Sequence, residues 1–134
     1  MEKARILVVD DEESMRDFMS IMLSKEGYEV VQADSGPSAL GHIKKARPDV
    51  IITDMMMPDM SGLELMTKAR EVHDNLSFIV MTAFASVDSA IEAMKKGAYD
   101  YITKPFKVDE IKLTIKKVLE KEQISRENKE LKKE

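Results

Sequence analysis

Two patterns of apolar residues alternate five times along the chain. Short apolar runs rich in β-branched residues are typical of strands, and longer segments with apolar positions three and four apart are typical of helices. The first pattern predicts strands at residues 5–10, 29–33, 50–54, 78–82 and 99–103. The second predicts a helix after each strand, with boundaries marked by Gly27, Ser35-Gly36-Pro37, the capping pair Ser61 and Glu64, Gly97 and Val108.

This alternation is typical of an α/β fold with a doubly wound parallel sheet and right-handed crossovers. Residues 6–9, 50–52 and 78–81 are apolar on both faces, which indicates central strands. Residues 29–32 and 99–102 include polar side chains, as edge strands do. The sequence therefore predicts a flavodoxin-like (βα)5 sheet with strand order 2-1-3-4-5, and a ligand site between its first and third strands.

Composition narrows the range of functions. The 134 residues, 43% of them hydrophobic, suit one compact domain. The absence of cysteine excludes disulfides and thiol chemistry and fits a cytoplasmic location. No apolar run approaches the roughly 20 residues that a membrane-spanning helix needs. A net charge of −4 disfavours direct nucleic-acid binding by this segment.

Polar residues follow the predicted central strands at the point where each strand ends. Asp10 and Asp11 end the first strand, Asp54 the third and Thr82 the fourth, and Lys104 follows the fifth. Parallel strands place all these ends along one edge. Each residue alone is more often a loop cap or a surface group, but the joint placement indicates a site.

The chemistry of this group favours phosphoryl transfer. Three adjacent carboxylates repel one another unless a cation joins them. Oxygen ligands without a thiol favour Mg²⁺, with Mn²⁺ as a substitute. Mg²⁺ and Lys104 together would neutralise a transferring phosphoryl group, which makes Asp54 the candidate nucleophile and an aspartyl phosphate the expected product.

Four motifs carry a resemblance to a known family. They are Val-Val-Asp-Asp-Glu at 8–12, Thr-Asp-Met-Met-Met-Pro at 53–58 with Gly62, Met-Thr-Ala at 81–83, and Tyr-Ile-Thr-Lys-Pro-Phe at 101–106. Over residues 3 to 121 this ordered set strongly resembles a bacterial response-regulator receiver domain. The resemblance implies a switch that becomes phosphorylated and dephosphorylates slowly, without turnover of a separate substrate.

The resemblance also implies roles for the site residues. Asp54 would accept the phosphoryl group from a sensor histidine kinase, and Lys104 would contact it. Asp10, Asp11, Asp54 and the backbone carbonyl of Met56 would bind Mg²⁺. The Lys104–Pro105 peptide bond would be cis, which is uncommon for X–Pro bonds in general.

Further residues match the family's switch and its phosphate entrance. Thr82 would move to hydrogen-bond the phosphoryl group while Tyr101 turns inward, which alters the face made by the fourth helix, fifth strand and fifth helix. Met56 and Phe84 would flank the entrance as gating residues. Because neither side chain can orient an attacking water, we expect slow autodephosphorylation.

The last residues differ in composition from the rest. Residues 1–121 are expected to form the receiver and residues 122–134 a helical linker, with Ile124, Asn128 and Leu131 at coiled-coil spacing. A paired helix and a frayed end both remain open. The linker resembles that of nitrogen-regulator-type activators of sigma-54 polymerase, which implies ATPase and DNA-binding domains further along, transcriptional output, and a homodimer through the switch face or the linker.

Three other functions are alternatives to the receiver, and each can be compared with the residues that it would need. A haloacid-dehalogenase-type phosphatase needs an Asp two residues after its nucleophile, where this chain has Met56. A phosphate loop at residues 36–41 would need Lys and Ser or Thr next, where this chain has His42 and Ile43. A receiver-like module that binds partners without being phosphorylated remains the alternative.

Overall fold

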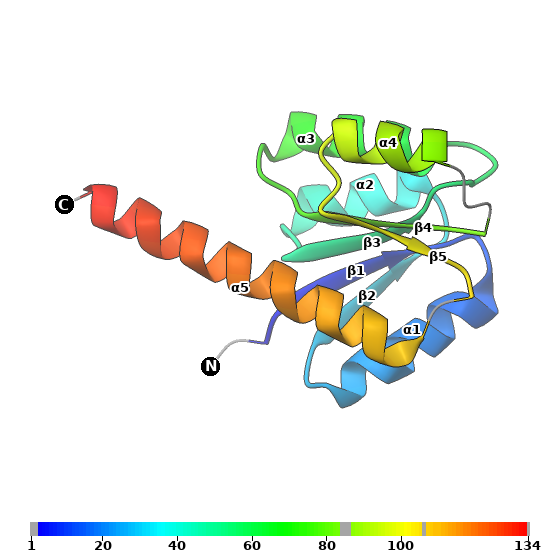
Figure 1. The fold of residues 1–134 in the computed structure, drawn as a ribbon, viewed down its shortest axis with the longest axis horizontal. Helices are drawn as coiled ribbons and strands as arrows, with labels where there is room; N and C mark the ends of the chain where they lie inside the picture. The colour runs from blue at the N-terminus through cyan, green and yellow to red at the C-terminus, as the bar shows by residue number, and fades with distance from the viewer. Residues whose placement is uncertain (1–2, 84–86, 106, 134) are drawn as a thin grey trace.

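The computed structural model describes residues 3–83, 87–105 and 107–133, with the side chains of Val87 and of residues 122–133 excepted. Five parallel strands form one sheet in the order β2-β1-β3-β4-β5, which confirms the predicted topology (Figure 1). The strands are β1 (Arg5–Val9), β2 (Glu29–Ala33), β3 (Val50–Asp54), β4 (Phe78–Thr82) and β5 (Asp100–Thr103).

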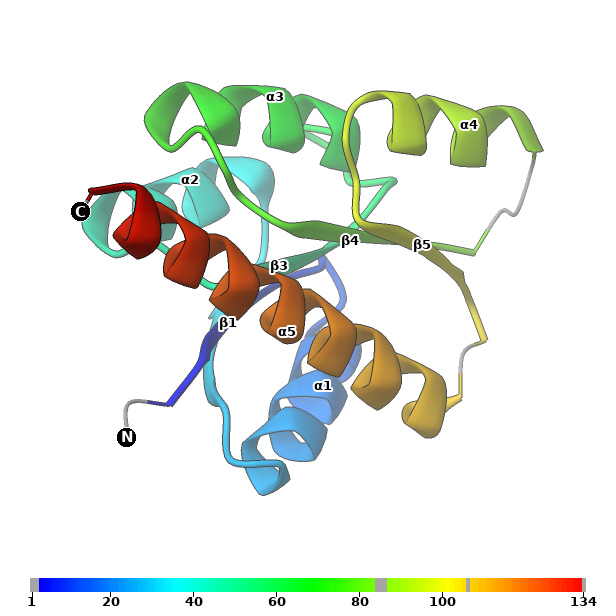
Figure 2. The same ribbon diagram turned by 60° about the vertical axis from the view of Figure 1, so that its left-hand side comes forward.

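Helices cover both faces of this sheet. They are α1 (Glu13–Lys25), α2 (Gly36–Lys45), α3 (Gly62–Val72), α4 (Val87–Lys95) and α5 (Val108–Lys133). Helices α2, α3 and α4 lie on one face, and α1 and α5 lie on the other (Figures 1 and 2). Alternate residues of the central strands enter the two cores: Leu7, Ile51 and Phe78 face α2 to α4, and Ile6, Ile52 and Ile79 face α1 and α5.

Local signals in the sequence account for the helix boundaries. The Ser35 hydroxyl accepts a hydrogen bond from the Ser38 amide at 3.2 Å, and Pro37 lies in the first turn of α2. At α3, the Ser61 hydroxyl accepts from the Glu64 amide at 3.1 Å. Helix α1 is followed by Gly27, whose φ of 91° lies in the left-handed region. The predicted starts and stops of these helices are confirmed.

The structure differs from the prediction in small ways. Strand β1 ends at Val9 and not at Asp10, because the Asp10 carboxylate accepts the Glu12 amide at 3.0 Å and turns the chain away from the ladder. Strand β5 starts one residue later than predicted, at Asp100. Phe18 has the helical spacing of a core residue but is 45% exposed, since it lies beside the buried stripe of α1.

Helix α5 continues well past the sheet. It runs to Lys133 as a single helix, and its second half projects beyond the body of the domain (Figure 1). The side chains of Ile124, Asn128 and Leu131 lie outside the described residues, so the coiled-coil seam stays a prediction. In the part of the chain that the structure describes, no helix is both long and apolar enough to cross a membrane.

Candidate functional site

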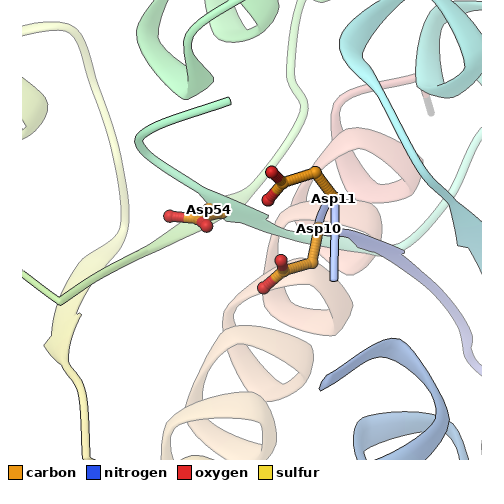
Figure 3. A group of neighbouring side chains, drawn as sticks. All are labelled: Asp10, Asp11 and Asp54. Atoms are coloured by element: carbon orange, nitrogen blue, oxygen red, sulfur yellow. The ribbon is translucent and has the colours of Figure 1, made fainter. Parts of the chain in front are cut away.

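The three predicted carboxylates meet at the carboxyl ends of β1 and β3. These strands are neighbours, with Val9 in register with Thr53, so Asp10 and Asp54, which follow them, lie at the same level of the sheet edge. One carboxylate oxygen from each of Asp10, Asp11 and Asp54 lies within 4.8 Å of the others (Figure 3). Asp10 and Asp54 are buried and Asp11 is exposed. The group therefore consists of two buried carboxylates and one carboxylate exposed to solvent.

Lys104 joins this group from the other end of the chain. Its Nζ lies 3.3 Å from Asp10 Oδ2 and 3.4 Å from Asp54 Oδ2. The Lys104 amide donates to the Thr82 carbonyl at 2.7 Å, which fixes the residue at the end of β4. The Lys104–Pro105 peptide bond is cis, as the family resemblance implied. Residues separated by 94 positions thus form one ion cluster.

Backbone amides hold the two buried carboxylates in place. The Glu12 amide donates to Asp10 Oδ1 at 3.0 Å, and the Met56 amide donates to Asp54 Oδ1 at 3.2 Å. In both residues the other oxygen, Oδ2, contacts Lys104. Each carboxylate is therefore oriented by its own loop before any ligand arrives.

Gly62 lets the loop after β3 fold back onto the site. Its amide donates to the Met55 carbonyl at 2.9 Å. A Cβ at this position would lie 2.6 Å from the Asp54 carbonyl oxygen and 3.1 Å from the Met55 Cα. Met55, Met57 and Met60 are buried under this loop, whereas Met56 is 62% exposed at the pocket. The close approach explains why glycine is needed here, a role that the sequence analysis did not assign.

Burial sets the electrostatics of the pocket. Burial raises the pKa of Asp10 and the nearby Asp54 carboxylate raises it further, while the Glu12 amide and Lys104 offset part of this rise. For Lys104, burial alone would lower the pKa, but the attraction of Asp10 and Asp54 outweighs it and the pKa is raised. Lys104 is therefore charged at neutral pH, and one ammonium faces three carboxylates.

This donor set fits a hard divalent cation. Three carboxyl groups and one lysine concentrate acidic groups in a partly buried space, and a divalent cation would balance their charge. The donors are all oxygens, and Mg²⁺ commonly takes one or two carboxylates together with waters and phosphate. Asp10, Asp11 and Asp54 are the residues that would hold such an ion.

The raised pKa of Asp10 gives a testable pH dependence. In EDTA, Asp10→Asn is expected to increase the free energy of unfolding at about pH 7, because the folded chain then no longer buries an ionised carboxylate. A raised pKa means that the folded state binds the proton more tightly than the unfolded state. The gain should thus shrink as pH falls toward 3.8, the ordinary value.

Urea unfolding across this pH range measures the effect. The exposed Asp11, changed to Asn, is the matched control and should give a smaller gain. A gain for Asp10→Asn that is independent of pH would contradict the burial argument.

The two predicted switch residues lie on the neighbouring strands β4 and β5. Thr82 ends β4, is buried, and pairs with Thr103 of β5. Tyr101 of β5 is partly buried, and its hydroxyl lies 3.2 Å from the Ser89 hydroxyl of α4. No sequence pattern indicates which α4 side chain faces β5, so Ser89 could not be identified from the sequence. Phe84, the second predicted gating residue, lies outside the described residues.

Comparisons with known proteins agree with this geometry. Residues 6–116 match the family described as response regulator receiver domain. The chain is 37% identical over 123 residues to the regulatory protein AtoC of Escherichia coli, covering 92% of this chain but 27% of AtoC. It is 37% identical over 119 residues to sporulation initiation phosphotransferase F of Bacillus subtilis, covering 89% and 96% of the two chains.

A solved structure shows the same arrangement of elements. NtrX from Brucella abortus superposes with a TM-score of 0.90 at 35% sequence identity, covering 98% of this chain and 30% of NtrX. The chain therefore matches both a relative of similar length and segments of much longer proteins.

Proposed function

This chain belongs to the family of response regulator receiver domains, and on that basis we propose that it is a signalling switch that accepts a phosphoryl group on Asp54. It is a receiver and not an enzyme with a separate substrate. The observation that carries the proposal is the meeting of Asp10, Asp11, Asp54 and Lys104 at one edge of the sheet. Phosphoryl transfer from a small donor, read by intact mass, tests it.

The proposed transfer is a displacement at phosphorus. A carboxylate oxygen of Asp54 forms the new bond to phosphorus, and the bond between phosphorus and the donor, a histidine of a sensor kinase, breaks with its electron pair leaving on the donor. The Met56 amide donates to Asp54 Oδ1 and so orients the carboxylate. The Lys104 ammonium lies 3.4 Å from Oδ2, where it would stabilise the negative charge of the phosphoryl group during transfer. Mg²⁺, held by the three aspartates and the Met56 carbonyl, would supply further positive charge.

We propose that Thr82 and Tyr101 relay the phosphorylated state. The Thr82 hydroxyl would donate to the phosphoryl group, and Tyr101 would change orientation next to α4. Their positions on the neighbouring strands β4 and β5, and the contact of Tyr101 with Ser89, support this role. The α4-β5-α5 face would then present a changed surface to a partner or a second copy.

The output of the switch is also a proposal. We assign residues 1–121 to the receiver and 122–134 to a linker, supported by the continuous helix α5. We further propose that an ATPase and a DNA-binding domain follow the linker and control transcription. The chain spans about a quarter of the regulatory protein AtoC, so a relative of that length has room for such domains.

Binding of Mg²⁺ is expected to stabilise the fold. A ligand that binds only the folded state raises the free energy of unfolding by about 2.7 kcal/mol at a hundredfold excess over Kd. Urea unfolding with Mg²⁺ and with EDTA measures this difference. Asp11→Asn should abolish it, whereas Asp59→Asn, an exposed change just outside the group, should keep it. Equal stabilisation of both variants would argue against this metal site.

Met56 is proposed to keep the phosphoryl group long-lived. Its side chain is exposed two residues from Asp54 and offers no group that orients water. Met56→Gln is expected to speed loss of the phosphoryl group about fivefold, the equivalent of one hydrogen bond of about 1 kcal/mol. Met94→Gln, an exposed change on α4, is the control. An unchanged rate in the Met56 variant would count against gating. The same role for Phe84 stays a prediction.

A further inference from the structure

Among the contacts of the described residues, two unlike ones lie near the two ends of helix α4. One contact involves the switch residue Tyr101, and the other involves residues with no part in the proposed phosphoryl site. We propose that Arg70 is a positioning residue that makes the C-terminal end of α4 a fixed pivot, while Ser89 makes its first turn follow Tyr101. This inference deepens the proposed function and rests on it.

The C-terminal end of α4 is held from α3. The Gly97 amide donates to the Met94 carbonyl at 3.0 Å and the Ala98 amide to the Ala93 carbonyl at 3.1 Å, which closes the helix in a Schellman motif. The Arg70 guanidinium donates hydrogen bonds to the carbonyls of both Lys96 and Gly97, the second at 2.8 Å. One planar fork thus holds two successive carbonyls, a geometry that suits arginine and not lysine.

The guanidinium of Arg70 itself packs over an aromatic ring of the sheet. It lies 5.4 Å from the centre of the Phe78 ring, which is fully buried at the start of β4. A Cβ on Gly97 would come within 2.9 Å of Arg70 Nη1, so a larger residue there would push the guanidinium out of this contact. Arg70, with Phe78 beneath it and the two carbonyls that it holds, forms a clamp. This clamp joins α3, β4 and the end of α4 without involving Thr82 or Tyr101.

The first turn of α4 depends on the switch residue instead. The Ser89 hydroxyl lies 3.2 Å from the Tyr101 hydroxyl, and the Tyr101 ring packs against the core beneath α2, α3 and α4. Since the hydroxyl lies at the tip of the ring, a change in the χ1 angle of Tyr101 moves it relative to Ser89. The bond between the two hydroxyls is then lost or remade, and the first turn of the helix loses or regains this contact with β5.

Between these ends the helix is weakly attached. Within residues 88–95, whose side chains the structure describes, Ala93 is the fully buried residue, and Ile91 and Met94 are exposed. Among the described side chains of this helix, the fully buried one is therefore small, and a methyl group resists rotation far less than a large side chain would. A rigid helix held at one end by Arg70 and released at the other will swing about the held end.

Hydrogen–deuterium exchange on the whole chain tests this pivot. In the wild type, acetyl phosphate with Mg²⁺ is expected to change exchange at the amides of residues 88–91 and to leave residues 94–98 unchanged. Without phosphate, Arg70→Leu should speed exchange at 94–98 by about tenfold, the expected effect of losing two modest hydrogen bonds. With phosphate, the change in this variant should spread to both ends of α4. Arg70→Lys should restore part of the protection.

Two further variants sharpen the comparison. Arg47 donates in the same way to the Asn75 carbonyl but lies away from α4, so Arg47→Leu should behave as the wild type does. Ser89→Ala should speed exchange at 88–91 before phosphorylation and reduce the further change on phosphorylation.

The outcomes separate this inference from the proposed function. Absence of the phosphoryl adduct by mass would contradict the proposed function, while the effect of Arg70→Leu without phosphate would still test the clamp. The inference is overturned if phosphorylation changes both ends of α4 equally in the wild type, or if Arg70→Leu matches Arg47→Leu.

Discussion

Replacing Gly62 by alanine is expected to lower the free energy of unfolding by about 2–3 kcal/mol, the upper part of the range for overpacking. The added Cβ would stand 2.6 Å from the Asp54 carbonyl oxygen and 3.1 Å from the Met55 Cα. Both atoms belong to the backbone, so no rotamer change can relieve the contact. The loop after β3 would have to move, and it carries the amide that orients the Asp54 carboxylate.

The same substitution elsewhere in the chain provides the control. Gly41 lies exposed in the middle of α2, and a Cβ there would meet no atom within 4 Å. Gly41→Ala should raise stability by about 0.5–1 kcal/mol, because glycine is unfavourable inside a helix. Urea unfolding of both variants gives the comparison. Similar effects at the two positions would contradict the close approach at Gly62.

The sheet could be predicted from the sequence because burial leaves a direct mark on it. Residues 6–9, 50–52 and 78–81 are apolar on both faces because both faces are covered by helices. Once these strands are central, the order β2-β1-β3-β4-β5 follows with the edge strands outside them. Pattern and tertiary structure agree here because the same physical cause produces both.

The meeting of the acidic residues followed from the sheet. Parallel strands end at one edge, so Asp10 and Asp54 were expected to lie together before any distance was known, and their carboxylates are brought together with Asp11 and Lys104. The roles of these residues in phosphoryl transfer stay predictions, since proximity fixes the chemistry available and not the reaction that occurs.

Contacts between helices could not be predicted in this way. Arg70 has the sequence context of an ordinary residue near the end of α3, yet it holds the carbonyls that follow α4. Ser89 has the context of an ordinary polar residue, yet it meets Tyr101. Both contacts depend on how a helix is rotated and placed over the sheet, and small packing differences decide that rotation.

Asp54 is the residue that is expected to accept the phosphoryl group. Asp54 and Asp10 are both buried, held by a backbone amide and placed beside Lys104. The motif at residues 53–58 that resembles the receiver family is what makes Asp54 the expected acceptor. Asp54→Ala is therefore expected to abolish phosphorylation, the largest effect of any single change in the chain. Asp59→Ala, an exposed change in the following loop, should leave phosphorylation intact.

Intact mass after incubation with acetyl phosphate tests this claim most directly. The wild type should gain one phosphoryl group in Mg²⁺ and none in EDTA, and Asp54→Ala should gain none in either. A phosphoryl group on Asp54→Ala would show that another residue is the acceptor. No adduct on the wild type under any condition would contradict the phosphorylation switch and favour a receiver-like module that binds its partners without phosphate.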